Sequence, residues 1–75
     1  MENGWVIGLL VTGEAFPYAL FAVAEADQER AVAIIAEATA ETRGANDVVE
    51  IAGPISKRFL ESCGLTATGD YCALS

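Results

Sequence analysis

One stretch, Phe16 to Gly44, constrains the fold of this chain more than any other, because a strand pattern runs directly into the longest helical pattern. The strand is expected over about Tyr18–Glu25, where apolar residues alternate onto both faces. Asp27 follows as the expected N-cap of a helix. That helix is predicted to run to about Arg43 and to end at Gly44. The remaining segments are expected to pack against this strand–helix unit.

The predicted helix carries an apolar stripe at the i, i+3, i+4 spacing of a helix that faces a core. The stripe consists of Ala31, Ile34, Ile35, Ala38 and Thr42. Because it is rich in alanine, it allows a close approach to a sheet but buries little apolar area per residue.

A second strong strand pattern covers Trp5–Thr12, after a start at Met1–Gly4 that is expected to fray. At a period of two, one face carries Trp5, Ile7, Leu9 and Val11, and the other carries Val6, Gly8 and Leu10. Gly8 indicates a bulge or a close approach by a neighbouring element. The short connection to the next strand predicts an antiparallel hairpin.

After the helix, a third strand is predicted at Val48–Ala52, running parallel to the strand before the helix by the right-handed crossover rule. A second helix is predicted to open at Gly53-Pro54, with proline at its first position, and to close at Gly64. Its expected stripe is Ile55, Phe59 and Cys63, with Leu60 beside it. Tyr71–Leu74 is either a final weak strand or a tail along the sheet edge.

The element order β-β-α-β-α, with an optional final β, predicts one α+β domain over residues 1–75. The expected architecture is a two-layer sandwich, with a small mixed sheet and two helices on one face. A chain of 75 residues builds a marginal core, and such domains are often completed by a partner subunit.

An oligomer, most simply a homodimer, is expected because both faces of the first strand are apolar while the helices cover only one. Trp5, Ile7, Leu9 and Val11 are the predicted dimer interface, although the opposite face of the strand is a candidate too. Two alternatives remain open: the same patch lines a ligand pocket, or sheet twist and the C-terminal tail cover it within one chain.

The formal net charge of −7 argues against binding to nucleic acid or to anionic membranes, which attract Lys/Arg surfaces. No uncharged apolar run reaches the ~20 residues of a membrane helix. Trp5–Val11 also lacks the basic flank of an export signal, and the segment after it is interrupted by Gly13, Glu14 and Pro17. We therefore expect a cytoplasmic protein.

The absence of histidine removes the commonest general base and most zinc-site designs, and we predict no cofactor, metal or catalytic residue. Cys63 and Cys72 are expected to be reduced and buried, with a disulfide between them as the alternative. Two function classes remain. The first is an oligomeric interaction or regulatory domain, with room for a small ligand at a subunit interface. The second is a small enzyme whose site lies at a subunit junction and uses Tyr18, Tyr71 or Cys63.

A weak anion site is predicted where the second helix begins. There the free amides of the first helical turn coincide with two of the four basic residues of the chain. The residues concerned are Ile55, Ser56, Lys57 and Arg58. The alternative is an ordinary helix start with two solvated cations.

Overall fold

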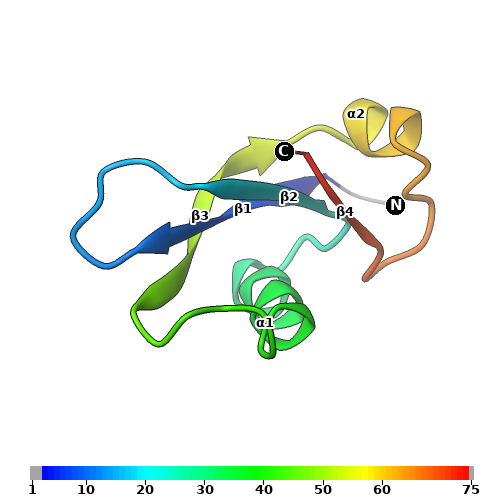
Figure 1. Cartoon of the computed structure of the whole chain (residues 1–75). Coiled ribbons are helices and arrows are strands. Elements are labelled where there is room, and N and C mark those ends of the chain that lie inside the picture. The colour runs from blue at the N-terminus through cyan, green and yellow to red at the C-terminus, as the bar shows by residue number, and fades with distance from the viewer. Residues whose placement is uncertain (1–2, 75) are drawn as a thin grey trace.

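The computed structural model describes residues 3–74, which form a four-stranded sheet with one helix on each side (Figure 1). The elements are β1 (Gly4–Val11), β2 (Ala19–Val23), α1 (Gln28–Ala38), β3 (Asp47–Ile55), α2 (Lys57–Ser62) and β4 (Tyr71–Ala73). The predicted α+β class and element order, including the final strand, are confirmed. Among the described residues, no helix combines the length and the apolar character that crossing a membrane requires.

The strands lie in the order β3-β1-β2-β4, and each neighbouring pair is antiparallel. The sheet is therefore antiparallel throughout, which corrects the prediction of a mixed sheet. Strands β2 and β3 do run in the same direction, which agrees with the crossover rule, because both are antiparallel to β1. However, β1 lies between them, so they are not hydrogen-bonded neighbours.

The two helices cover opposite faces of the sheet, which corrects the prediction that both lie on one face (Figure 1). Helix α1 covers the lower face of Figure 1, where the buried cluster is Ile7, Leu9, Val23, Ala31 and Ile35. Helix α2 lies on the upper face, where the buried cluster is Ala22, Ala24, Ile55, Leu60 and Leu65. The sheet thus has a separate buried cluster on each face, and β1 and β2 contribute side chains to both.

A β-bulge in β3 explains why α2 lies on the upper face. Ile51 pairs with Ile7, but Gly53 pairs with the preceding Val6, which leaves Ala52 as an extra residue. One extra residue reverses the alternation of the side chains after it. Ile55 therefore points into the upper cluster, and the chain enters α2 on that side.

Helix α1 begins as predicted and ends earlier than predicted. The Asp27 side chain accepts hydrogen bonds from the backbone amides of Glu29 and Arg30, which confirms it as the N-cap. The helix ends at Ala38, with Thr39 as its C-cap, and two side chains donate to carbonyls of its last turns. The Thr39 hydroxyl donates to the carbonyl oxygen of Ile35 (2.7 Å), and the Arg43 guanidinium donates to that of Ala36 (2.9 Å).

Helix α2 begins later than predicted. Pro54 belongs to β3, an edge strand, where the missing amide hydrogen is tolerated. Ser56 is the N-cap, and its hydroxyl oxygen accepts from the amide of Phe59. Because of this later start, Leu60 is the buried residue of the helix, whereas Phe59 is 45% exposed. Gly64 follows with a positive φ of 81°, as expected for a residue that closes a helix.

Two glycines of β1 allow close packing. Gly4 begins the strand rather than fraying, and a Cβ at this position would collide with the carbonyl oxygen of Val23. A Cβ at Gly8 would lie 3.1 Å from the Cβ of Pro17, so the close approach predicted for Gly8 is confirmed. The expected fraying of Met1 and Glu2 falls outside the described residues.

Candidate functional site

The four residues of the predicted dimer interface lie on the lower face of β1 and have different surroundings. Ile7 and Leu9 are buried beneath α1, where a partner subunit cannot reach them. Trp5 is half-buried at the edge of the same cluster, and Val11 is 40% exposed at the end of the strand. The interface prediction is therefore corrected for Ile7 and Leu9, because α1 covers the face that was expected to stay open.

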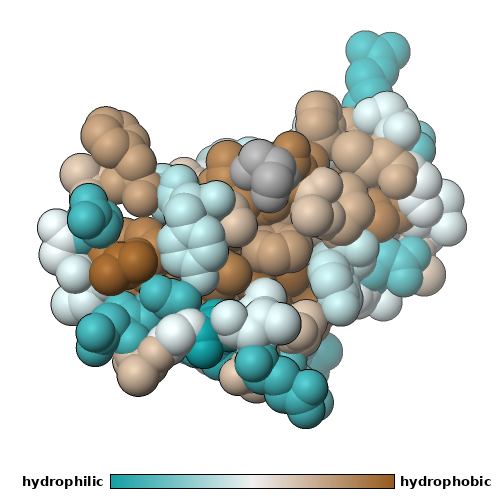
Figure 2. All heavy atoms as spheres, in the orientation of Figure 1, coloured by the Kyte–Doolittle hydropathy of each residue, from teal (hydrophilic) through white to brown (hydrophobic). Residues whose placement is uncertain are grey.

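The upper face remains open along the half that α2 does not reach. By alternation from Val6 and Ala22 of the upper cluster, this open half of the upper face includes Gly8, which is buried beside Pro17, and Leu10, Leu20 and Val48, which are half-buried. In Figure 2 apolar atoms gather along the upper side of the molecule, between the β1–β2 loop and α2. The part of the sheet that no helix covers thus lies on the other candidate face of β1, which carries Val6, Gly8 and Leu10.

A hollow of about 230 Å³ lies on this open half; we call it the upper hollow. Its walls come from β1, the β1–β2 loop and β3, and consist of Gly8, Leu10, Ala15, Pro17, Glu50, Ile51 and Ala52. Glu50 is the only charged residue among them, and its side chain is exposed. The hollow therefore suits an apolar group better than a charged one.

Phe16 is 84% exposed and stands between Ala15 and Pro17, which both line the upper hollow. It is not itself a lining residue, and its exposure leaves the ring accessible to another molecule. An exposed phenylalanine next to an apolar hollow is an arrangement typical of interaction surfaces.

The loop that carries Phe16 is fixed at both ends. At its start, the amide and hydroxyl of Thr12 both donate to the carbonyl oxygen of Asn46, at 2.8 and 2.7 Å. At its end, the hydroxyl of Tyr18 donates to Asp47 Oδ2 (2.6 Å), which also accepts from the amide of Gly44 (2.7 Å). Both ends of the loop are therefore anchored to residues 44–47, the segment that leads into β3.

The Tyr18–Asp47 pair has shifted pKa values. The hydrogen bond from Tyr18, followed by that from the Gly44 amide, holds the pKa of the Asp47 carboxyl below its ordinary value. The same bond to Asp47 raises the pKa of Tyr18. Both shifts move the pKa of the group further from pH 7, so neither prepares its group for acid–base chemistry at physiological pH. The pair is better explained as the anchor of the loop.

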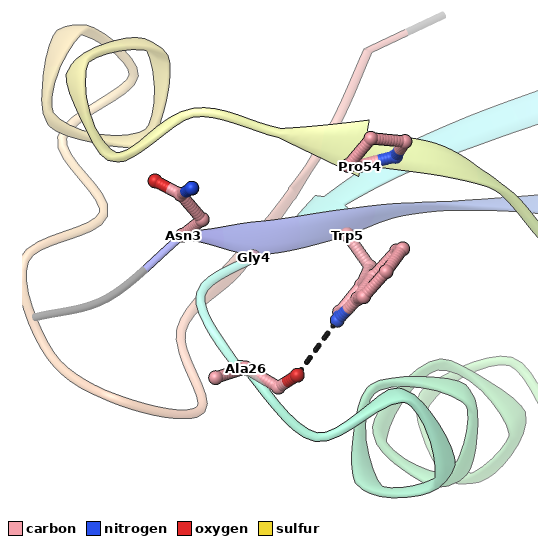
Figure 3. A pocket seen from close by; sticks show the side chains of 5 residues that line it. All are labelled: Asn3, Gly4, Trp5, Ala26 and Pro54. Atoms are coloured by element: carbon pink, nitrogen blue, oxygen red, sulfur yellow. Dashed lines mark hydrogen bonds between the residues drawn. The ribbon is translucent and has the colours of Figure 1, made fainter.

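A second, more open cleft of about 530 Å³ lies at the other end of β1 (Figure 3). It is lined by Asn3, Gly4, Trp5, Ala26 and Pro54. The indole Nε1 of Trp5 donates to the carbonyl oxygen of Ala26 (2.8 Å), and Asn3 Oδ1 accepts from the amide of Lys57 (2.9 Å). The Trp5 Nε1 and the Asn3 Oδ1 are thus both engaged within the chain.

The residues of the predicted anion site do not present their hydrogen-bond donors to one common point. Ile55 is buried in β3, and the amide of Lys57 already donates to Asn3. Lys57 Nζ lies 3.8 Å from Glu61 Oε1, and Arg58 is exposed. Anion binding at Ile55, Ser56, Lys57 and Arg58 therefore stays a prediction, which these contacts do not test.

The two cysteines are half-buried and unpaired, and they pack against the same upper cluster. Burial, followed by the charge and hydrogen bonding of the neighbouring Cys63 thiol, raises the pKa of Cys72. Within residues 3–74, no group of three or more His, Cys, Asp or Glu side chains is placed to hold a metal ion.

Sequence reasoning missed Phe16 and the upper hollow. The signal was present, since Phe16 lies in a turn segment between Ala15 and Pro17, outside every predicted strand and helix. A large aromatic residue in such a loop has no core position assigned to it. Its exposure is therefore the natural expectation, yet Phe16 enters the sequence-based prediction only as the start of the strand–helix unit.

Comparison with known proteins gives no relative of this chain. No protein-family model matches it, and neither a curated protein nor a solved structure is significantly similar to it.

Proposed function

We propose that this protein is a small interaction domain that associates with a second copy of itself through the open half of the upper face. The observation that carries the proposal is the exposed Phe16 ring beside an apolar hollow on the same surface. In a two-fold symmetric dimer, each subunit offers both features to the other. Phe16 of each copy would enter the upper hollow of its partner.

The size of a stable interface means that the contact extends beyond the hollow. A standard interface buries roughly 800 Å² per partner. This is about a sixth of the 4624 Å² surface of the chain. The other open positions, Leu10, Leu20 and Val48, supply apolar surface around the hollow. Phe16 would act as the aromatic anchor of the contact, the role in which such residues contribute most to affinity.

Charge gives the proposal a distinctive salt dependence. Each copy carries a formal charge of −7, so two copies repel each other at long range. Glu50 is the one charged residue among those that line the hollow, so the contact itself brings in one carboxylate from each copy. Because salt screens the remaining repulsion, association is expected to strengthen as the salt concentration rises. A basic protein partner would show the opposite dependence.

The proposal is tested by measuring molar mass by light scattering over a range of protein concentrations. The wild type is expected at twice the 7.8 kDa of one chain at tens of micromolar (about 10–100 µM). Phe16→Ala removes the aromatic anchor, and Ala52→Glu places a charge in the hollow. Each variant is expected to raise the dimer dissociation constant about tenfold or more. Tyr71→Ala is the matched control, because Tyr71 is also exposed but lies on the lower face of β4.

The outcomes separate the proposal from its alternatives. Dimers that are weakened by Phe16→Ala and Ala52→Glu, but not by Tyr71→Ala, support it. A monomeric wild type at these concentrations refutes self-association. Dimers that neither variant affects place the contact on another surface, and this result refutes the role of the upper hollow.

A further inference from the structure

Cys63 and Cys72 come together from two separate elements. Cys63 is the C-cap of α2, and Cys72 is the middle residue of β4, where it pairs with Ala22 of β2. Side chains on the upper side of this pairing point toward α2, and both thiols pack against the upper cluster. The Cys63 thiol is close enough to affect the ionisation of Cys72 through charge and hydrogen bonding.

Strand β4 is the weakest part of the sheet. It has three residues, it pairs only with β2, and its other side has no neighbouring strand among the described residues. The segment that connects it to α2 includes Leu65, which is buried, and a turn at Gly69 with a positive φ of 96°. A covalent link between Cys63 and Cys72 would therefore connect this edge strand directly to the helix that covers the upper cluster.

We infer that Cys63 and Cys72 are a reversible modification site, at which a small disulfide such as oxidised glutathione converts the two thiols into an intrachain disulfide. The Cys63 thiolate attacks one sulfur of the small disulfide, which releases one small thiol and leaves a mixed disulfide on Cys63. The Cys72 thiolate then attacks the Cys63 sulfur and releases the second small thiol. In total, two protein thiols are oxidised and one small disulfide is reduced to two thiols.

The order of these steps follows from the surroundings of the two thiols. Cys72 lies in β4 with a raised pKa, so little of it is thiolate at neutral pH. It suits the second, intramolecular step, where proximity compensates for a low thiolate fraction. Cys63 is the C-cap of α2, outside the sheet, and it is only half-buried, so it is assigned the first, intermolecular step.

The test equilibrates the full chain with mixtures of reduced and oxidised glutathione, followed by acid quenching, alkylation and measurement of the intact mass. The expected oxidised product is a single chain lighter by two hydrogen atoms that takes no alkyl label, and reduction should return a chain that takes two labels. Cys72→Ser is expected to stop at one glutathione adduct on Cys63. Cys63→Ser removes the attacking thiol, and its adduct on Cys72 is expected to form more slowly.

A second readout follows the fold. The disulfide is expected to raise the urea midpoint of unfolding and to slow amide hydrogen exchange in β4, with no such change in Cys72→Ser under the same oxidising mixture. Oxidised chains that carry two glutathiones, chains linked to each other, or no reaction over the whole range of mixtures would each overturn the inference. The experiment is repeated with Phe16→Ala, so its result does not depend on self-association.

Discussion

Replacing Leu60 by alanine tests whether the upper face has a core of its own. Leu60 is the only buried residue of α2 and is completely buried within the upper cluster. The change removes roughly three carbon atoms, at about 0.8 kcal/mol of transfer free energy each, and leaves a cavity. The expected loss is about 3 kcal/mol in the free energy of unfolding. For a domain of this length this corresponds to a fall of roughly 12–24 °C in Tm.

Phe59→Ala is the matched control, since it shortens the neighbouring side chain of the same helix, which is 45% exposed. We expect it to cost about 1 kcal/mol or less. Urea unfolding of both variants can be followed by the fluorescence of Trp5, the single tryptophan, at one fixed protein concentration. If Leu60→Ala costs no more than Phe59→Ala, the upper cluster does not support the fold and the two-sided architecture is refuted.

Two further predictions concern the sheet and the loop. Gly4→Ala should lower the free energy of unfolding by about 1–3 kcal/mol, because the added Cβ would collide with the Val23 carbonyl. Gly53→Ala should be nearly neutral, since an added Cβ there has no atom within contact distance. Equal urea midpoints of unfolding for the two variants would contradict this prediction. Because the folded-state pKa of Asp47 is lowered, its stabilising contribution is present above its ordinary pKa of 3.8 and is lost as pH falls below it. Tyr18→Phe removes the main cause of that shift, so the acid-induced loss of stability should be smaller than in the wild type, and an unchanged pH profile would contradict the loop anchor.

Much of the local structure was predictable, because it depends on residues that are close in sequence. The N-cap at Asp27, the hairpin of β1 and β2 and the close approach at Gly8 all follow from spacing and residue type. The end of α1 was predicted too late, since the helical pattern continues to Arg43 whereas the helix itself ends at Ala38.

The placement of α2 could not be read from the sequence, because it depends on one extra residue at the β3 bulge. Ala52 looks like any other strand residue, yet it moves Ile55 from one face of the sheet to the other. Once α2 lies on the upper face, α1 alone covers Ile7 and Leu9. The sequence pattern of β1 is apolar on both faces and does not show which face α1 covers, so the interface was assigned to Ile7 and Leu9 although α1 buries them.

The most direct test of the proposed self-association is whether the Phe16 ring contacts the upper hollow of a second copy. An isotope-filtered NOE experiment on a mixture of labelled and unlabelled chains detects only contacts between subunits. We predict NOEs from the ring protons of Phe16 to the methyl groups of Ala15 and Ala52, which line the hollow. A sample with the mass of a dimer that gives no NOE between subunits at Phe16 would contradict the proposed contact.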